Sequence, residues 1–188
     1  MTDSFLSDSR FHPPSHREPF WQVGSQVRWQ LDAWQQDWLL DKGSLTQRLI
    51  KASDGQFRVE IQRQKLLPSY LSEARLLGIK PTQQVMVREV ILLGRDQPWV
   101  FARSIIPLST LTGRLRALKK LDNRPLGALL FQNPNMHRDA IEVAQVRPGD
   151  RYLPETLKTS QTYWGRRSRF FLDDKPLLVS EVFLDRPG

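Results

Sequence analysis

Two charged residues, Arg88 and Glu181, lie in segments that otherwise have the composition of buried β-strands. Arg88 belongs to "QVMVREVILL", where Met86 and Val90 share its strand face. Glu181 belongs to "PLLVSEVFL" and shares a face with Val179. An ionised group on an inward face costs several kcal/mol unless it is paired or bound to a ligand. The two positions are therefore candidates for a binding site.

Three arrangements of these charges are compatible with the pattern. Both side chains could face solvent from a half-exposed sheet, or the two could pair with each other. In the third arrangement, an inward Arg88 and an inward Glu181 form the two polar ends of an apolar pocket. Such a pocket suits a small ring that carries a carboxylate at one end and a hydroxyl at the other.

A second concentration of charge is "WGRRSR", residues 164–169, which invites comparison with nucleic-acid-binding segments. On a strand, Arg167 and Arg169 share one face while Arg166 and Ser168 share the other, so the run is not one basic stripe. The pattern alone favours a solvated strand face. The six tryptophans are scattered rather than interleaved with the basic residues, which indicates core and edge packing.

Other chemical signatures are absent from the sequence. There is no glycine-rich phosphate loop, and the chain has no cysteine. The three histidines are His12, His16 and His137, and two of them fall in a proline-interrupted polar segment. We therefore predict neither a metal site nor a cofactor, and no Ser or Cys nucleophile with a His base.

Composition sets the broad class. The 188 residues are 39% apolar and 26% charged, as in ordinary globular proteins, and are enough for one domain with a sizeable core. No apolar run is long enough to span a membrane, and the N-terminus lacks a secretory signal pattern, so we expect a cytoplasmic protein. The formal charge of +8 permits an anionic partner without selecting one.

Periodicity predicts an α+β fold. Residues 1–19 are expected to form a flexible arm, ahead of a single domain over 20–188. Apolar spacing predicts helices at 27–38, 45–52, 111–121 and from 125, with a helix or loop mixture at 67–79. Alternation predicts strands at 55–66 and 138–146 and hairpins over 84–107 and 164–184. About six strands, mostly joined by hairpins, favour an antiparallel sheet.

Five ordered segments resemble the bacterial chorismate lyase family. They are "DWLLDKGSLTQRL", "VREVILLGRDQPWVFARSIIPLSTL", "RPLGALLF", "RDAIEV" and "WGRRSRFFLDDKPLLVSEVFL". The resemblance implies an antiparallel sheet with helices on one side and helical flaps over a buried site. It also implies cofactor-free conversion of chorismate to 4-hydroxybenzoate and pyruvate, the first committed step of ubiquinone synthesis.

The resemblance extends to four site residues. Arg88 corresponds to the arginine that holds the ring carboxylate, and Glu181 to the glutamate that meets the ring hydroxyl; both are expected to be catalytic and to bind substrate. Leu126 corresponds to the "PLG" leucine whose backbone helps bind ligand. Leu45 occupies a first-flap position where some members have Met. We expect a monomer with no nucleic-acid partner and no transmembrane segment.

The loop from about 148 to 163 is longer than in the short members of the family, which bears on flap cover or surface contacts. Three alternatives stay open: a ligand-binding domain of the same fold, as in some transcription regulators, a basic nucleic-acid-binding protein, and a peripheral membrane protein. The regulators carry a DNA-binding domain in front, and the arm expected here is short and proline-rich. No predicted amphipathic helix has a strongly basic polar face.

Overall fold

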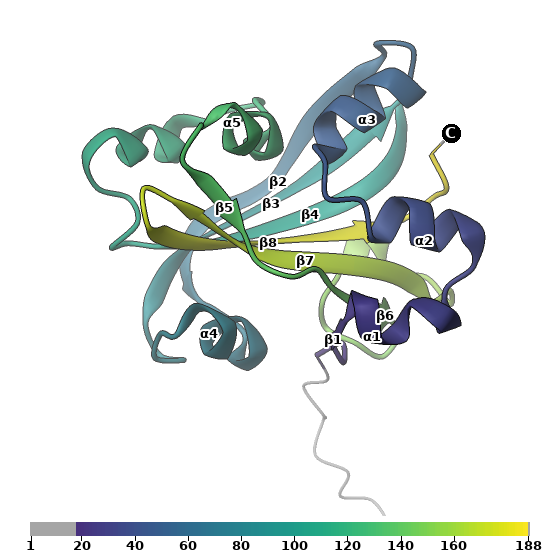
Figure 1. Ribbon diagram of the computed structural model, residues 1–188, viewed down its shortest axis with the longest axis horizontal. Helices are drawn as coiled ribbons and strands as arrows, with labels where there is room; N and C mark the ends of the chain where they lie inside the picture. Colours follow the sequence, from purple (N-terminus) through teal and green to yellow (C-terminus); the bar gives the residue numbers. More distant parts are fainter. Residues whose placement is uncertain (1–17, 188) are drawn as a thin grey trace, which may run out of the picture.

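The computed structural model describes residues 18–187 (Figure 1). Except for Glu18 and Pro19, the expected N-terminal arm lies outside the described residues. Glu18 contacts the rest of the chain, because its carboxylate accepts hydrogen bonds from the backbone N–H groups of Leu71 and Ser72.

The core of the fold is one eight-stranded antiparallel sheet, which confirms the predicted α+β class. The strands are β1 (Gln22–Val23), β2 (Phe57–Pro68), β3 (Gln84–Gly94), β4 (Gln97–Pro107), β5 (Met136–Arg138), β6 (Glu142–Val146), β7 (Tyr163–Leu172) and β8 (Lys175–Phe183). Their order is β1-β6-β7-β8-β4-β3-β2, with β5 also paired to β7. β2 therefore forms one edge of the sheet and β3, β4, β8 and β7 its centre.

In the described part of the chain, five α-helices and three 3-10 helices connect the strands. The α-helices are α1 (Gly24–Val27), α2 (Ala33–Leu39), α3 (Leu45–Ala52), α4 (Leu71–Leu77) and α5 (Leu126–Gln132); the 3-10 helices are η1 (Arg28–Gln30), η2 (Gly113–Lys120) and η3 (Glu155–Leu157). None of the helices formed by residues 18–187 combines the length and apolarity required to cross a membrane.

Both predicted hairpins are confirmed, and two-residue turns fix their register. Arg95 and Asp96 have φ of 51° and 60°, and Asp173 and Asp174 have the same two values. Two successive left-handed residues are typical of the tight turns whose twist matches that of paired strands. The β3–β4 hairpin sets Arg88 opposite Ser104.

The predicted helix over 27–38 is wrong in one respect, because it is broken. α1 and η1 end before Leu31, which is extended, and α2 starts anew after Asp32. Asp32 caps α2 by accepting from the Gln35 N–H, and the Gln35 side chain accepts from the Asp32 N–H. This capping box stabilises a new helix start inside the apolar repeat.

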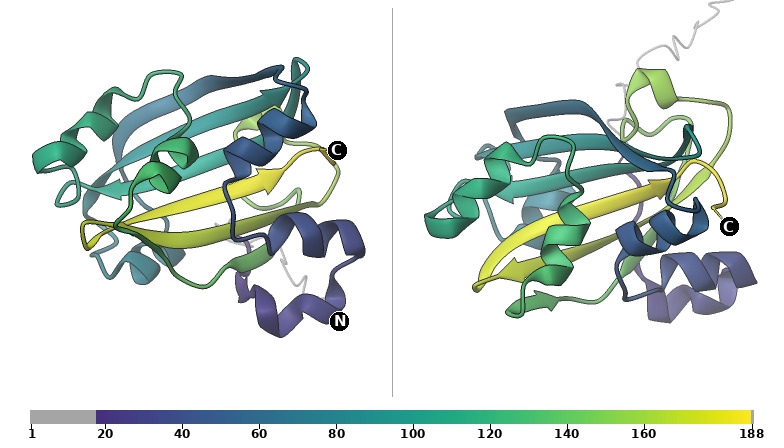
Figure 2. Two further views of the ribbon diagram at one scale, coloured as in Figure 1. Left: turned by 45° about the horizontal axis from the view of Figure 1, so that its top comes forward. Right: turned by 90° about the horizontal axis from the view of Figure 1, so that it is seen from above.

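The two faces of the sheet have different covers (Figures 1 and 2). α2, α3, α5 and η2 cover one face, here called the front, while α4 and the segment around Tyr152 cover the back. α4 is thus a helix on the side opposite to the other helices, an addition to the expected arrangement. It packs through Leu77 on Val87 and Ile105.

Candidate active site

A band of polar side chains crosses the front of the sheet between two apolar clusters. On β3, Arg88 separates Met86, in the cluster under α5, from Val90, in the cluster under α2 and α3. On β8, Glu181 separates Val179 from Phe183 in the same way. Ser104 on β4 and Ser168 on β7 lie in the same cross-strand row as Arg88. Arg166 on β7, opposite Glu181, and Arg138 on β5 complete the band.

Arg88 is 2% exposed and hydrogen-bonded to neutral groups. Its Nη1 donates to Oε1 of Gln64 at 2.9 Å, and its Nη2 donates to the carbonyls of Asp122 at 2.7 Å and Arg124 at 3.3 Å. Burial lowers the pKa of Arg88 from its ordinary value, while the more distant Asp122 carboxylate raises it. A guanidinium has five N–H donors, so this one retains donors for an anionic ligand.

Glu181 faces the same side, and its side chain is 15% exposed. It pairs with Arg166 on β7, whose Nε lies 2.6 Å from Oε2. The Nη1 of Arg166 also donates to the carbonyls of Trp38 and Asp41, both at 2.8 Å. Arg88 and Glu181 therefore do not pair with each other, and the expectation that both could face open solvent is wrong.

Strand geometry sets the spacing of these two side chains. Arg88 and Glu181 are two strands apart and offset by two residues, which places their Cα atoms roughly 12 Å apart. Because both side chains point to the front, a six-membered ring with polar groups at opposite ends would span the interval.

A third arginine, Arg138 on β5, was not predicted as a site residue. Its Nε donates to Oγ of Ser168 at 3.0 Å, and its Nη1 donates to the Lys42 carbonyl at 3.2 Å. Burial, with a smaller effect from the Arg166 charge, lowers the pKa of Arg138 to about 10. The charges of Glu181 and Asp41 offset this effect only in part, and the hydrogen-bond acceptors of Arg138 are neutral groups, so an anion beside it would be favoured. The one indication of Arg138 in the sequence is "RD" before an apolar strand, and charged residues commonly precede strands of any function.

Leu45 and Leu126 are the first residues of α3 and α5, and both are buried. The two helices meet at Gly127, where an added Cβ would lie 2.9 Å from Oγ1 of Thr46. Leu126 lies two residues after Arg124, whose carbonyl accepts from Arg88. Leu126 belongs to the apolar cluster that contains Met86, and Leu45 belongs to the cluster that contains Phe183.

The predicted solvated face of "WGRRSR" is wrong. Arg166 and Arg167 are buried on opposite faces, as the alternation required, and each is paired with a carboxylate. Arg167 donates to Glu142 at 2.6 Å and to Ser72 at 2.9 Å on the back of the sheet. The exposure of such a run cannot be predicted from the sequence, because buried and exposed ion pairs are made by the same residue types.

Within residues 18–187 no group of three or more His, Cys, Asp or Glu side chains is placed to hold a metal ion. The polar band instead offers three guanidinium groups, one carboxylate and two hydroxyls within a largely apolar enclosure. This set can bind a small ring with two acidic groups and one hydroxyl, and can stabilise negative charge that develops on a leaving group.

Comparisons with known proteins agree with this chemistry. The family described as "Chorismate lyase" matches residues 16–187. A "Probable chorismate pyruvate-lyase" of Photobacterium profundum is 41% identical over 147 residues, covering 78% of this chain and 76% of that protein. A "Probable chorismate pyruvate-lyase 2" of Pseudomonas entomophila is 40% identical over 174 residues, covering 93% of this chain and 92% of that protein.

Solved structures share the fold at low identity. A GntR-family transcriptional regulator from Bacillus cereus has a TM-score of 0.53 and 12% identity, covering 71% of this chain and 94% of that one. The PhnF C-terminal domain has a TM-score of 0.53 and 13% identity, covering 68% of this chain and 82% of that one. These likenesses bear on the architecture alone.

Proposed function

The chain belongs to the chorismate lyase family, and on that premise we propose that it eliminates pyruvate from chorismate to give 4-hydroxybenzoate. The observation that carries the proposal is the polar band between two apolar clusters. Its charges match the substrate, which has a ring carboxylate, a ring hydroxyl and a second carboxylate on the enolpyruvyl group.

The substrate is oriented by its two ends. We place the ring carboxylate at Arg88, where the planar guanidinium can make a bidentate contact that Lys would not reproduce. The hydroxyl at the opposite end of the ring then points to Glu181. The enolpyruvyl group is attached to the carbon next to the one bearing the hydroxyl, so its carboxylate falls on the Arg166 and Arg138 side. Arg138 is the better candidate, since Arg166 is already paired with Glu181.

The reaction breaks the C3–O bond and removes the hydrogen from C4, which completes the aromatic ring. The electrons of the C3–O bond leave with enolpyruvate, and a proton on its methylene carbon gives pyruvate. Arg138 offsets the charge that develops on this leaving group. Glu181 accepts the hydrogen bond of the hydroxyl and positions the C4 hydrogen for transfer.

The front helices keep water from the reacting ring. Leu45 and Leu126 begin the two helices that meet at Gly127, and their apolar side chains lie on either side of the band. The backbone N–H of Leu126 is one of the first four amides of α5, which lack acceptors within the helix, so it is available to ligand. Aromatisation supplies the driving force, and the protein holds one conformer in a dry enclosure.

We further propose that the enzyme comprises residues 20–188, acts in the cytoplasm as a monomer without a metal or cofactor, and serves the first committed step of ubiquinone synthesis. A second candidate function is a non-catalytic domain that binds a small aromatic ligand. Arg88 and Glu181, on either side of the ring position, would hold such a ligand without any turnover.

One experiment separates the two. Purified protein is incubated with chorismate after treatment with EDTA, and 4-hydroxybenzoate and pyruvate are quantified over time. Equal amounts of both products support the lyase. Binding of 4-hydroxybenzoate without turnover of chorismate would support the ligand-binding domain instead. Activity that is restored only by an added metal would overturn the cofactor-free mechanism.

The same assay tests the two carboxylate sites. Arg88→Ala should weaken 4-hydroxybenzoate binding by roughly tens-fold, because removing one partner of a buried charge pair costs about 2–5 kcal/mol. Arg138→Gln should leave 4-hydroxybenzoate binding nearly unchanged and raise the KM for chorismate, which alone carries the enolpyruvyl carboxylate. If Arg138→Gln weakened the binding of 4-hydroxybenzoate and of chorismate equally, Arg138 would not be the residue that binds the enolpyruvyl carboxylate.

A further inference from the structure

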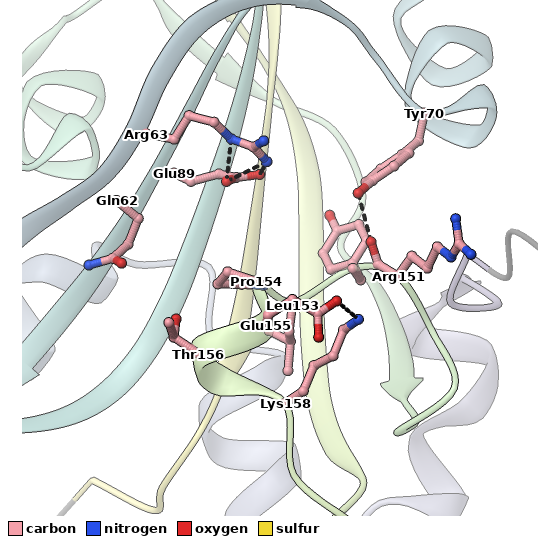
Figure 3. A pocket seen from close by; sticks show the side chains of 11 residues that line it. Gln62, Arg63, Tyr70, Glu89, Arg151, Leu153, Pro154, Glu155, Thr156 and Lys158 are labelled. Atoms are coloured by element: carbon pink, nitrogen blue, oxygen red, sulfur yellow. Dashed lines mark hydrogen bonds and ion pairs between the residues drawn. The ribbon is translucent and has the colours of Figure 1, made fainter.

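A cleft of about 650 Å³ opens on the back of the sheet, away from the polar band (Figure 3). One wall is formed by Arg63 on β2 and Glu89 on β3, and the opposite wall by Pro154, Glu155 and neighbouring residues of the loop that follows β6. This loop is the segment singled out in the sequence for its length. A volume of this size suits a small metabolite.

The carboxylate of Glu89 on the cleft wall is fully engaged. Arg63 donates to it through Nε and Nη2, both at 2.9 Å, and Arg103 donates to it through Nη1 at 2.5 Å. Glu89 is buried, while the side chain of Arg63 is 42% exposed. An incoming ligand therefore meets the open edge of the Arg63 guanidinium before it meets the carboxylate.

The loop wall adds two further cations. Lys158 is paired with Glu155, which is 86% exposed and so is held only weakly by this contact. Arg151 lies at the rim, where its backbone carbonyl accepts from the hydroxyl of Tyr70 at 2.7 Å. Arg63 and Lys158 thus supply the positive charge of the cleft, against one saturated and one exposed carboxylate.

The cleft shares its strands with the candidate active site. Arg63 lies opposite Glu89 and Gln64 opposite Arg88 in consecutive register pairs, just after the bulge between Ile61 and Arg63. Arg63 and Glu89 point to the back, whereas Gln64 and Arg88 meet on the front at 2.9 Å. The Arg63–Glu89 pair therefore lies on the back and the Gln64–Arg88 pair on the front of the same two strands.

We propose that this back cleft is a second binding site, for a small anion bearing carboxylate or phosphate groups, held by Arg63 and Lys158. The site is distinct from the polar band and does not depend on the lyase reaction. Guanidinium and ammonium groups both bind such oxyanions, Arg63 through a planar edge and Lys158 as a point charge.

Isothermal titration of the full chain with citrate and, separately, with pyrophosphate tests the proposal. We expect at least one of the two probes to bind at one site per chain. Binding of citrate would indicate a carboxylate ligand, and binding of pyrophosphate would indicate a phosphate ligand. Lys158→Gln and Arg63→Gln should each weaken binding by roughly two- to fivefold, in proportion to the loss of one partly exposed contact. Glu155→Gln should strengthen it by a similar factor, since it releases Lys158.

Two controls make the outcome decisive. Lys120→Gln removes an exposed lysine from η2, on the front of the sheet, and should leave the affinity unchanged. Arg88→Ala should retain the site, which excludes binding at the polar band. Absence of binding by both probes, loss of binding in Arg88→Ala, or equal weakening in Lys120→Gln and Lys158→Gln would overturn the proposal.

Discussion

Glu181 is the residue whose removal best separates chemistry from folding. Glu181→Gln keeps the shape of the side chain and an acceptor for Arg166, but it carries no charge and cannot accept a proton. We expect turnover of chorismate to fall at least tenfold in a protein that stays folded, since the lost counter-charge of Arg166 costs only about 1–3 kcal/mol of the free energy of unfolding while the amide keeps an acceptor for it. The measurement is paired: the urea midpoint and the rate of 4-hydroxybenzoate formation for wild type and variant.

A matched control is Glu142→Gln, which removes the carboxylate partner of Arg167 on the back face. It removes the carboxylate of a second arginine–carboxylate pair on β7, and this pair lies outside the polar band. If both variants lose turnover equally, the effect of Glu181→Gln is structural. If Glu181→Gln turns over chorismate normally, Glu181 has no part in the reaction.

Single charges on apolar strands were the informative residues in the sequence. Arg88 and Glu181 could be identified because their neighbours on the same face are apolar, so an inward charge needs a partner or a ligand. Arg166 and Arg138 could not, since arginines near other charges are commonly solvated. Arg166 is buried and Arg138 partly buried because the carbonyl groups of Trp38, Asp41 and Lys42 accept from them, and only the folded chain brings these groups together.

At the scale of elements, the turn between α2 and α3 is held to the sheet by arginines. The Asp41 carbonyl accepts from Arg166, and the Asp41 carboxylate accepts from the Gly43 N–H at 2.8 Å and from Arg48 at 3.2 Å. Burial alone would raise the pKa of Asp41, but these hydrogen bonds and the Arg166 charge together lower it below 3.8. The ionised form of Asp41 therefore stabilises this turn.

The lowered pKa of Asp41 determines how the stability of the protein depends on pH. A carboxylate whose pKa is lower in the folded state contributes stability above its unfolded pKa, and this contribution is lost as the pH falls through the folded value. At pH 7, Asp41→Asn should cost about 0.5–1 kcal/mol, since the group is partly exposed. The difference from wild type should shrink progressively below pH 3.8. Urea unfolding at pH 7 and pH 3 checks this, and a difference that stays constant would contradict it.

Local signals predicted some elements better than others. Ser44 caps α3 by accepting from the Gln47 N–H, as the sequence indicated, and the hairpin turns were marked by their flanking alternation. The break at Leu31 was missed because the apolar repeat continues across it. The helical "LTGRLRALKKL" became a 3-10 segment, η2, whose Leu115 and Leu118 still pack on the front cluster. Apolar spacing records which residues are buried, and it does not distinguish one continuous helix from shorter turns that bury the same face.

At the scale of the whole molecule, the two faces of the sheet are stabilised differently. The front carries two apolar clusters and the polar band between them, whereas the back contains a buried chain of charges centred on Arg103. Arg103 donates to Glu73 through Nε at 2.8 Å and through Nη2 at 3.1 Å, and to Glu89 through Nη1. Although burial opposes its charge, pairing with Glu73 raises the pKa of Arg103 above its ordinary value.

This charge network couples α4 to the centre of the sheet. Glu73 is fully buried in α4 and also accepts from the Tyr70 N–H at 2.8 Å, so it caps the helix from within the network. Glu89 connects Arg103 to Arg63 at the edge of the sheet. Removing Arg103 would leave Glu89 with Arg63 as its partner, whereas the buried Glu73 would have no ion-pair partner among residues 18–187.

Arg103→Leu should therefore destabilise the protein by about 3–5 kcal/mol, the usual cost of an uncompensated buried charge. The double variant Arg103→Leu/Glu73→Gln should recover a large part of that loss, because it removes the orphaned carboxylate and keeps an acceptor for the Tyr70 N–H. Urea unfolding at pH 7 of wild type, both single variants and the double variant gives the coupling energy directly. A double variant no more stable than Arg103→Leu would show that Arg103 acts through packing, such as its contact with the Tyr70 ring at 4.3 Å, rather than through its charge.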